Sequence, residues 1–318
     1  MLMHSRVFLI VLVLLALHGC AQPVQKEVAA PETPAPAPVK PAMQVVVLVS
    51  EDTPAYSDVA NALARQLGKR GSIRYLSGHQ VDDLKMVGAY SNDEHKQIVS
   101  IGLNASVAAK RLGNRQVVFC QVFNYQDYAL LSTRHKGVSM TPSLRKTFIT
   151  WRALSPRITD IGVISGPGFD DLMQTAKAEA RNHGINLHHV VVNSDKEYLY
   201  AHKQMAGKVQ GYWLLPDNRV LSGLVLRDVM TFSVRNSKQV AVFNDELLKL
   251  GGLFSVTTDP QDIAQQVLER LEQAQNADAM PGPDIVYPDK FNLRINAVMA
   301  QRLDLAIPGV LKKYANAP

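Results

Sequence analysis

Short apolar runs alternate with amphipathic segments along most of this 318-residue chain, and this alternation limits the possible fold more than any other feature. The run QVVVLVS at 44–50 precedes a segment in which Val59, Leu63 and Leu67 recur at helical spacing. The runs IRYLSG and QVVFCQVFN follow, with a short strand predicted between them at 98–101. Strands buried on both faces are apolar throughout, and alternating strands and helices give parallel sheets with right-handed crossovers. The first part of the chain therefore predicts one α/β lobe.

A second series of the same kind begins after the segment TPSLRKTFITWRALSP, which predicts a helix that ends at Pro156. The strand-like runs in this series are TDIGVIS, INLHHVVVN, GYWLLPD and QVAVFND. The predicted helices among them are FDDLMQTAKAEARNHG, with Gly184 as its stop signal, and VLSGLVLRDVMTFSVRN. The pattern predicts an α/β protein of two lobes, each built on a parallel sheet.

The first twenty residues have the organisation of an export signal. Arg6 precedes an apolar run from Val7 to Leu17, which is shorter than the ~20 residues that a membrane-spanning helix needs. Residues 17–20, Leu-His-Gly-Cys, resemble the lipobox of bacterial lipoproteins, which implies a signal peptide at 1–19 and a lipid such as palmitate on Cys20. An ordinary cleaved signal peptide with an incidental cysteine is the alternative.

Proline and alanine dominate residues 20–43, which have almost no large apolar side chain. Such a segment buries no core, so we expect an extended tether of polyproline character, rising ~3.1 Å per residue and reaching on the order of 70 Å. Ala21, directly after the predicted lipidation site, resembles an outer-membrane sorting signal of two-membrane bacteria. The sequence thus predicts a protein that is lipid-anchored in the bacterial cell envelope and faces the periplasm, with the outer membrane favoured.

The composition argues for a packed core and against nucleic acid as a partner. The chain is 47% hydrophobic and 19% charged, and about 275 residues follow the tether, which is enough for two lobes. The formal net charge is +6, but the basic residues are scattered and form no basic patch. Cys120 is the single cysteine besides Cys20, so an intramolecular disulfide is excluded from the folded part.

No catalytic, metal or cofactor motif is found in the sequence. His188 and His189 fall in a predicted strand and point to opposite faces, and neither His-Glu-x-x-His nor Cys-x-x-Cys spacing occurs. Ser165 lacks the Gly-x-Ser-x-Gly elbow of a nucleophile. Cys120 lies in an apolar strand, where a buried and inert thiol is expected. We therefore predict no enzyme activity, no cofactor and no metal site.

Small polar residues follow nearly every predicted strand. In an open parallel sheet, the ligand site lies outside the carboxyl ends of the strands. The apolar run before Pro216 stops at Asp217 and Asn218, which either face such a site or only cap the following helix. Other strands end in Ser-Glu-Asp at 50–52, in Gly-Leu-Asn-Ala-Ser at 102–106 and in Phe-Asn-Tyr at 123–125. These strand ends predict a polar cleft.

The order of several segments resembles one family of binding proteins. These segments include VQGYWLLPDN, VAVFNDELLKLGGLFSV and LRINAVMAQRLDLAIP, within roughly residues 98–308. They are similar to the substrate-binding lipoproteins of ABC importers with a type 1 periplasmic-binding fold, a branch in which some members bind aromatic amino acids. The resemblance implies two Rossmann-like lobes with parallel sheets, joined by a hinge. Residues 44–139 plus 254–281 would form lobe 1, and 140–253 plus 282–318 lobe 2, with crossings near 137–142, 251–254 and 281–287.

The same resemblance implies a small polar, amino acid-like ligand in the cleft and an inner-membrane ABC permease as partner. Asn104 and Ser106 would meet a carboxylate, Asp217 an ammonium group, and Tyr56 or Tyr125 an apolar side chain. The bulky Phe123, where the family tends to have a small hydroxyl residue, is expected to fill part of the cleft. A second hypothesis is an outer-membrane lipoprotein that reuses the fold as an envelope interaction or assembly factor. The full set of predicted ligand residues is Ser50, Tyr56, Asn104, Ser106, Asn124, Tyr125, Ser139, Asp217, Asn218 and Asn244.

Overall fold

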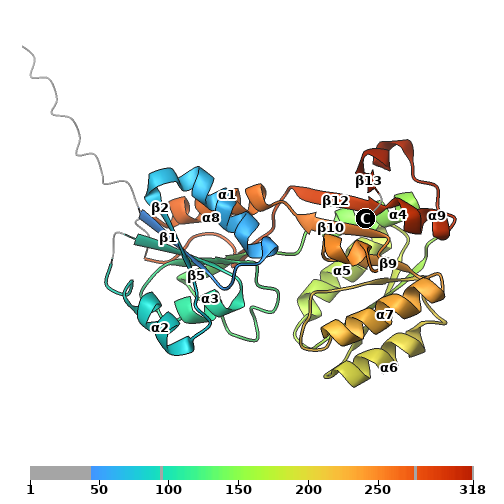
Figure 1. Ribbon diagram of the computed structural model, residues 1–318, viewed down its shortest axis with the longest axis horizontal. Helices are drawn as coiled ribbons and strands as arrows, with labels where there is room; N and C mark the ends of the chain where they lie inside the picture. The colour runs from blue at the N-terminus through green and yellow to red at the C-terminus, as the bar shows by residue number, and fades with distance from the viewer. Residues whose placement is uncertain (1–43, 94–95, 276–277, 317–318) are drawn as a thin grey trace, which may run out of the picture. The chain divides into compact units, whose positions relative to one another are not determined.

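The computed structural model describes residues 44–93, 96–275 and 278–316. The predicted signal peptide, Cys20, Ala21 and the tether lie outside the described residues. Residues 42–318 form one compact unit of the chain. Within the described part, the α/β fold is built on two sheets, as the alternation predicts (Figure 1).

The first sheet contains six parallel strands. In spatial order they are β11 (Ile285–Val286), β5 (His135–Val138), β4 (Val117–Cys120), β3 (Lys96–Ile101), β1 (Gln44–Val49) and β2 (Gly71–Tyr75). Helices α1 (Pro54–Leu67) and α8 (Pro260–Ala274) cover one face, and α2 (Gln80–Gly88) and α3 (Leu103–Ala109) cover the other (Figure 1). The turn η1 (Gly68–Arg70) joins α1 to β2.

Strand β1 shows why this sheet needs two helical layers. Val45, Val47 and Val49 pack with α1 and α8, while Val46 and Leu48 pack with α2 and α3. All five side chains are at most 1% exposed. Because successive side chains of a strand point to opposite faces, a strand that is buried on both faces must be apolar at every position. The run of valines in the sequence is the direct result.

The second sheet contains seven strands. In spatial order they are β13 (Ala315–Asn316), β12 (Phe291–Asn296), β10 (Phe254–Thr258), β9 (Gln239–Val242), β8 (Gly211–Trp213), β6 (Asp160–Ser165) and β7 (Asn186–Val191). Only the pairing of β10 with β12 is antiparallel among these described strands. Helices α4 (Leu144–Leu154), α5 (Asp170–Asn182) and α9 (Ala297–Arg302) cover one face, and α6 (Asp195–Met205) and α7 (Gly223–Arg235) cover the other. The short helices η2 (Asp245–Leu248) and η3 (Gly309–Tyr314) complete this lobe.

The chain passes between the sheets at positions that differ from two of the three predicted crossings. The first passage, between β5 and α4, falls at 139–143, close to the predicted 137–142. The second passage comes after β10. This strand was predicted to belong to lobe 1, but it pairs with β9 and β12 in the second sheet. The third follows β11, which pairs with β5 in the first sheet. Residues 254–258 therefore belong to the second lobe, and 282–286 to the first.

Helix α7 also begins later than its sequence suggests. Its N-cap is Ser222, whose hydroxyl accepts a hydrogen bond from Val225 N–H. The interpretation of Asp217 and Asn218 as caps of this helix is therefore wrong. The apolar run stops at Pro216 because strand β8 has ended, and the polar residues that follow lie in the loop beyond it.

Candidate functional site

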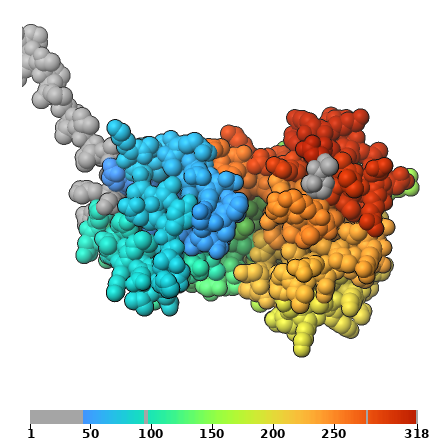
Figure 2. Space-filling model, in the orientation of Figure 1, coloured from blue at the N-terminus to red at the C-terminus, as the bar shows by residue number. Residues whose placement is uncertain are grey.

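A cleft of about 780 Å³ lies at the carboxyl ends of strands from both sheets. The first lobe contributes the loop after β1, the start of α1, the start of α3 and the loop after β4. The second lobe contributes the ends of β8, β9 and β10. Residues 140–142 of the first passage also line it. In the space-filling view, the surface is hollowed where the blue segment of the first lobe faces the orange segment of the second (Figure 2).

The cleft meets the first sheet where its strand order reverses. Strand β1 lies between β2 and β3, so the loops that leave β1 and β3 turn to opposite faces and open a crevice. Glu51 follows β1 and Leu103 follows β3, and both line the cleft. The position of the cavity is therefore the one that open α/β sheets use for ligands.

Four of the predicted ligand residues line this cleft: Tyr56, Asn124, Asn218 and Asn244. Tyr56 is half-buried. The pKa of its phenol is raised, mainly by burial and to a smaller extent by the negative charge of Glu51. Asn124 is 9% exposed. Asn218 is exposed, and Asn244 is exposed while its side chain caps η2 by accepting a hydrogen bond from Glu246 N–H.

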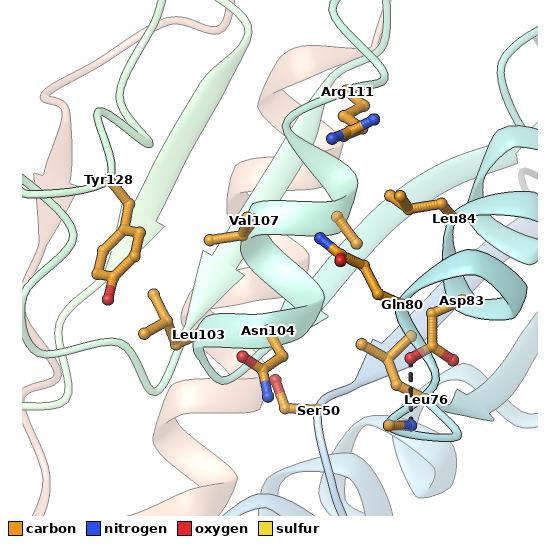
Figure 3. A pocket seen from close by; sticks show the side chains of 12 residues that line it. Ser50, Leu76, Gln80, Asp83, Leu84, Leu103, Asn104, Val107, Arg111 and Tyr128 are labelled. Carbon is orange, nitrogen blue, oxygen red and sulfur yellow. Dashed lines mark hydrogen bonds between the residues drawn. The ribbon is translucent and has the colours of Figure 1, made fainter.

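Two predicted residues line a different, smaller groove of about 330 Å³ in the first lobe. Figure 3 shows this groove, with Asn104 and Val107 of α3 on one side and Gln80 and Leu84 of α2 on the other. Arg111, in the turn after α3, also lines it. Ser50 lies at its edge, where its hydroxyl accepts a hydrogen bond from Ala105 N–H at 2.9 Å and so stabilises the start of α3. Ser50 and Asn104 are therefore separated from the cleft residues that they were predicted to join.

Three further predicted residues make structural contacts instead. Ser106 is 3% exposed and its hydroxyl donates to Gly102 C=O at 2.7 Å. The Tyr125 ring packs on Phe119 at a centroid distance of 5.7 Å, and burial raises the pKa of its phenol to about 12. The Ser139 hydroxyl accepts a hydrogen bond from Thr141 N–H at 3.0 Å within the first passage. These contacts hold the loops around the cleft.

Asp217, predicted to meet an ammonium group, is instead engaged by the protein itself. It is 3% exposed, and its carboxylate accepts hydrogen bonds from Arg219 Nε at 2.7 Å, Arg219 Nη2 at 2.8 Å and Gly166 N–H at 2.7 Å. Gly166 follows β6 and Asp217 follows β8, so this ion pair fills the crevice where the strand order of the second sheet reverses. The hydrogen bonds that Arg219 donates to Asp217 are the main cause that raises the pKa of Arg219.

Arg219 also connects the two lobes. Its guanidinium pairs with Asp127, which lies in the loop after β4 of the first lobe. Beside this pair, Phe123 of the same loop packs on Phe169 of the second lobe with ring centroids 4.6 Å apart. Phe123 lines one edge of the cleft and packs against the core of the second lobe.

A family model described as ABC transporter substrate binding protein matches residues 81–317, well over half of the chain. The chain belongs to this family. Its members bind substrates and are not enzymes, and those of ABC importers work with permeases and are periplasmic or otherwise associated with the cell envelope. No helix among the described residues has the length and apolar character to cross a membrane.

Solved structures with the same fold support this assignment at the level of architecture. An ABC domain from Streptococcus pneumonia in complex with L-Trp has a TM-score of 0.63 and 20% sequence identity, covering 86% of this chain and 99% of its own. A conserved domain protein from Vibrio cholerae has a TM-score of 0.62 at 19% identity, with the same coverage. A ligand-free, open substrate binding protein with adhesive properties from Clostridium difficile has a TM-score of 0.65 at 13% identity, again over 86% and 99%. A search of curated proteins gives no match.

The cleft of this substrate-binding protein also contains residues that the sequence did not single out as ligand contacts. Trp213 and Phe243 form an apolar wall at the ends of β8 and β9. Glu51 and Asp58 contribute carboxylates from the first lobe. Gln121 lines the cleft with φ 58°, a backbone conformation that is uncommon for a residue other than glycine and is often found at functional sites. Glu51 follows a strand and was visible as a candidate, whereas nothing in the sequence marks Gln121.

Ser165, His189 and Cys120, which have catalytic potential, do not line the cleft. Ser165 Oγ lies 2.8 Å from His189 Nε2, but the serine is 0% exposed and also donates to Gly166 C=O. Burial lowers the pKa of His189. The Cys120 thiol is 0% exposed, and burial raises its pKa to about 12, so the expectation of a buried thiol is confirmed. The described residues contain no group of three or more His, Cys, Asp or Glu positioned for a metal ion.

Proposed function

We propose that this protein captures a small polar, amino acid-like ligand in the cleft between its lobes, as the solute-binding component of an ABC importer. The observation that carries the proposal is the cleft of about 780 Å³, lined from both lobes at the carboxyl ends of their strands. This volume lies within the ~300–1,000 Å³ typical of small-molecule sites. The lining combines apolar side chains such as Trp213 and Phe243 with polar groups that can orient a ligand, as small-molecule sites do.

Ligand capture involves closure of the two lobes around the three passages of the chain. A ligand that contacts both lobes stabilises the closed state only by its higher affinity for that state. The passages at 139–143, near 259 and at 287–290 are the segments that absorb the change in backbone conformation. A ligand that binds without any change in the small-angle scattering curve contradicts this part of the proposal.

Export and anchoring complete the proposed role. Cleavage after residue 19 leaves Cys20 to carry acyl chains, and residues 20–43 act as a tether that holds the folded part away from the membrane. Replacement of Cys20 by alanine should release the mature protein from the membrane fraction, while ligand binding by residues 42–318 is unchanged. Fractionation between the inner and outer membranes then tests the outer-membrane address that Ala21 suggests.

The function is tested by thermal unfolding of the fragment 42–318, which is a compact unit, in the presence of amino acids, peptides, nucleosides and sugars. The fragment is first unfolded and refolded to remove bound ligand. A ligand that binds only the folded state adds ~2.7 kcal/mol of stability at a hundredfold excess over its dissociation constant. Asn124→Ala and Asn218→Ala should reduce the shift. Asn104→Ala, which lies in the separate groove, should preserve it.

Two outcomes argue against the proposal. If Asn104→Ala abolishes the shift and the cleft variants do not, the ligand site is the smaller groove. A folded protein with no shift for any ligand supports the second hypothesis instead, namely a binding-protein fold that serves as an envelope interaction or assembly factor.

A further inference from the structure

Carboxylates outnumber basic groups in the wall of the cleft. Glu51, Asp58, Asp245 and Glu246 line it, and among the residues that the structure describes Arg294 is the one basic side chain that does so. The chain as a whole has the opposite sign, with a formal net charge of +6. A cleft with low-dielectric walls concentrates the field of its own charges, so this local excess acts on a bound ligand more than the distant positive charges do.

The two acidic groups of the second lobe are already neutralised. Asp245 pairs with Arg294 at 2.9 Å, so that arginine is not free to hold the carboxylate of a ligand. Glu246 pairs with Lys249 at 2.6 Å, and both of these side chains are exposed. The second lobe therefore contributes little net charge to the cleft.

The two acidic groups of the first lobe are not neutralised. Glu51 and Asp58 have no ion-pair partner among the described residues, and both are on the segment that runs from the end of β1 into α1. The negative charge of Glu51 acts on the neighbouring cleft residue Tyr56, where it contributes to the raised pKa of the phenol. These two carboxylates leave the first lobe's side of the cleft with net negative charge.

Asn124 provides an independent sign of what the cleft recognises. It is 9% exposed, and its Nδ2 donates a hydrogen bond to Asp127 Oδ2 at 3.5 Å. The Asp127 carboxylate fixes this orientation, because the opposite one would place the amide oxygen against a negative charge. The Oδ1 atom, on a side chain that lines the cleft, is left with no partner among the described residues. This oxygen is not among the buried side-chain atoms that lack a partner, so it is open to solvent from the cleft. A ligand that donates a hydrogen bond to it therefore replaces a water molecule at an acceptor whose orientation is already set.

From these acceptors we infer that the cleft selects a ligand with net positive charge, such as a basic amino acid or an aliphatic amine. The inference rests on the proposed function and narrows its ligand class. Ammonium and guanidinium groups are hydrogen-bond donors only, which matches the Glu51 and Asp58 carboxylates and the Asn124 oxygen. The N-terminus of α1 at Pro54 also lines the cleft and favours a carboxylate, so a basic amino acid fits as well as an amine.

The test is isothermal titration of fragment 42–318 with three groups of probes at one pH and ionic strength. The cationic probes are L-arginine, L-lysine and putrescine, the neutral ones L-leucine and L-tryptophan, and the anionic one L-glutamate. We expect at least one cation to bind about tenfold or more tightly than every neutral or anionic probe. Its affinity should fall further as sodium chloride rises, because salt screens exposed charges.

Variants identify the groups responsible. Glu51→Gln and Asp58→Asn should each weaken binding of the cation by about three- to tenfold and leave a neutral probe within about twofold. Asn124→Ala should weaken it by a similar factor without changing its dependence on salt. Glu272→Gln removes the same charge from an exposed position of α8 outside the cleft and is the matched control.

The outcomes separate this inference from the proposed function. If a neutral or anionic probe binds as tightly as the cations, or if Glu51→Gln and Asp58→Asn behave like Glu272→Gln, the inference is wrong and the solute-binding role stands. If the folded protein binds no probe in the calorimetric titration and no ligand in the thermal screen, both this inference and the proposed solute-binding function are overturned.

Discussion

Removal of the Asp217 carboxylate should destabilise the second lobe by about 3 kcal/mol. The side chain is 3% exposed and accepts hydrogen bonds from Arg219 Nε, Arg219 Nη2 and Gly166 N–H, all within 2.8 Å. Breaking a fully buried ion pair costs ~3–5 kcal/mol. The lower end applies to Asp217→Ala, because the Arg219 side chain is 25% exposed and keeps its contacts with Asp127 and with Pro167 C=O. Asp217→Asn retains an acceptor for Gly166 N–H, so about half of this loss is expected.

Urea unfolding of fragment 42–318 measures this effect as the change in the free energy of unfolding. Asp228→Ala, at an exposed position of α7 in the same lobe, is the control and should stay within ~0.5 kcal/mol. A loss below ~1 kcal/mol for Asp217→Ala refutes the reasoning, since it means that the hydrogen bonds to the carboxylate add little to the stability of the protein. Asp127→Ala should cost less than ~1 kcal/mol, because that partner is one-third exposed.

Three further predictions concern the core. Gly211→Ala places a Cβ 2.5 Å from a backbone oxygen of the next strand and should cost ~2–3 kcal/mol in urea unfolding, while Gly207→Ala, with open space around it, should change little. Cys120, the only cysteine of fragment 42–318, should react with a thiol reagent only on unfolding, and fast labelling of the folded protein contradicts its burial. Burial lowers the pKa of His202 to about 4, below the ~6.5 of the unfolded chain, so its contribution to stability is complete above pH 6.5 and is lost as pH falls towards 4. His202→Gln should reduce the slope of stability against pH in this window by up to ~1.4 kcal/mol per pH unit, and a change as small as that of the exposed control His79→Gln counts against the argument.

The class of the fold could be predicted because a strand that is buried on both faces has an apolar local sequence. The run at 44–50 and strand β1 at Gln44–Val49 agree closely, as do TDIGVIS and strand β6 at Asp160–Ser165. Both strands are covered by helices on each face, so their interior positions carry no polar side chain and the run is visible without knowledge of the neighbours. The helices between them were visible for the same reason, through the spacing of their buried residues.

The local sequence of a strand does not show which other strands it pairs with. Phe254–Thr258 reads as a strand in either lobe, and only its pairing with β9 and β12 places it in the second sheet. The site was harder to predict still. Asp217 and Asn218 are neighbours after the same strand, yet Asp217 turns to Arg219 and Gly166 while Asn218 lines the cleft. Similarly, Asn104 starts the same helix as the cleft residue Leu103 but lines another groove.

The sequence by itself determined the alternation of strands and helices, the presence of two lobes and the edge of the sheets where polar loops gather. These features depend on contacts of each residue with its own strand or helix and on whether both faces are covered. Tertiary structure decided which polar side chains line the cleft and which ones pair with each other. It also decided that the Glu51 and Asp58 carboxylates have no ion-pair partner within the described part of the chain. A loop side chain often pairs with a residue that is distant in the chain, as Asp217 does with Gly166. The local sequence therefore does not show which partner lies within hydrogen-bond distance.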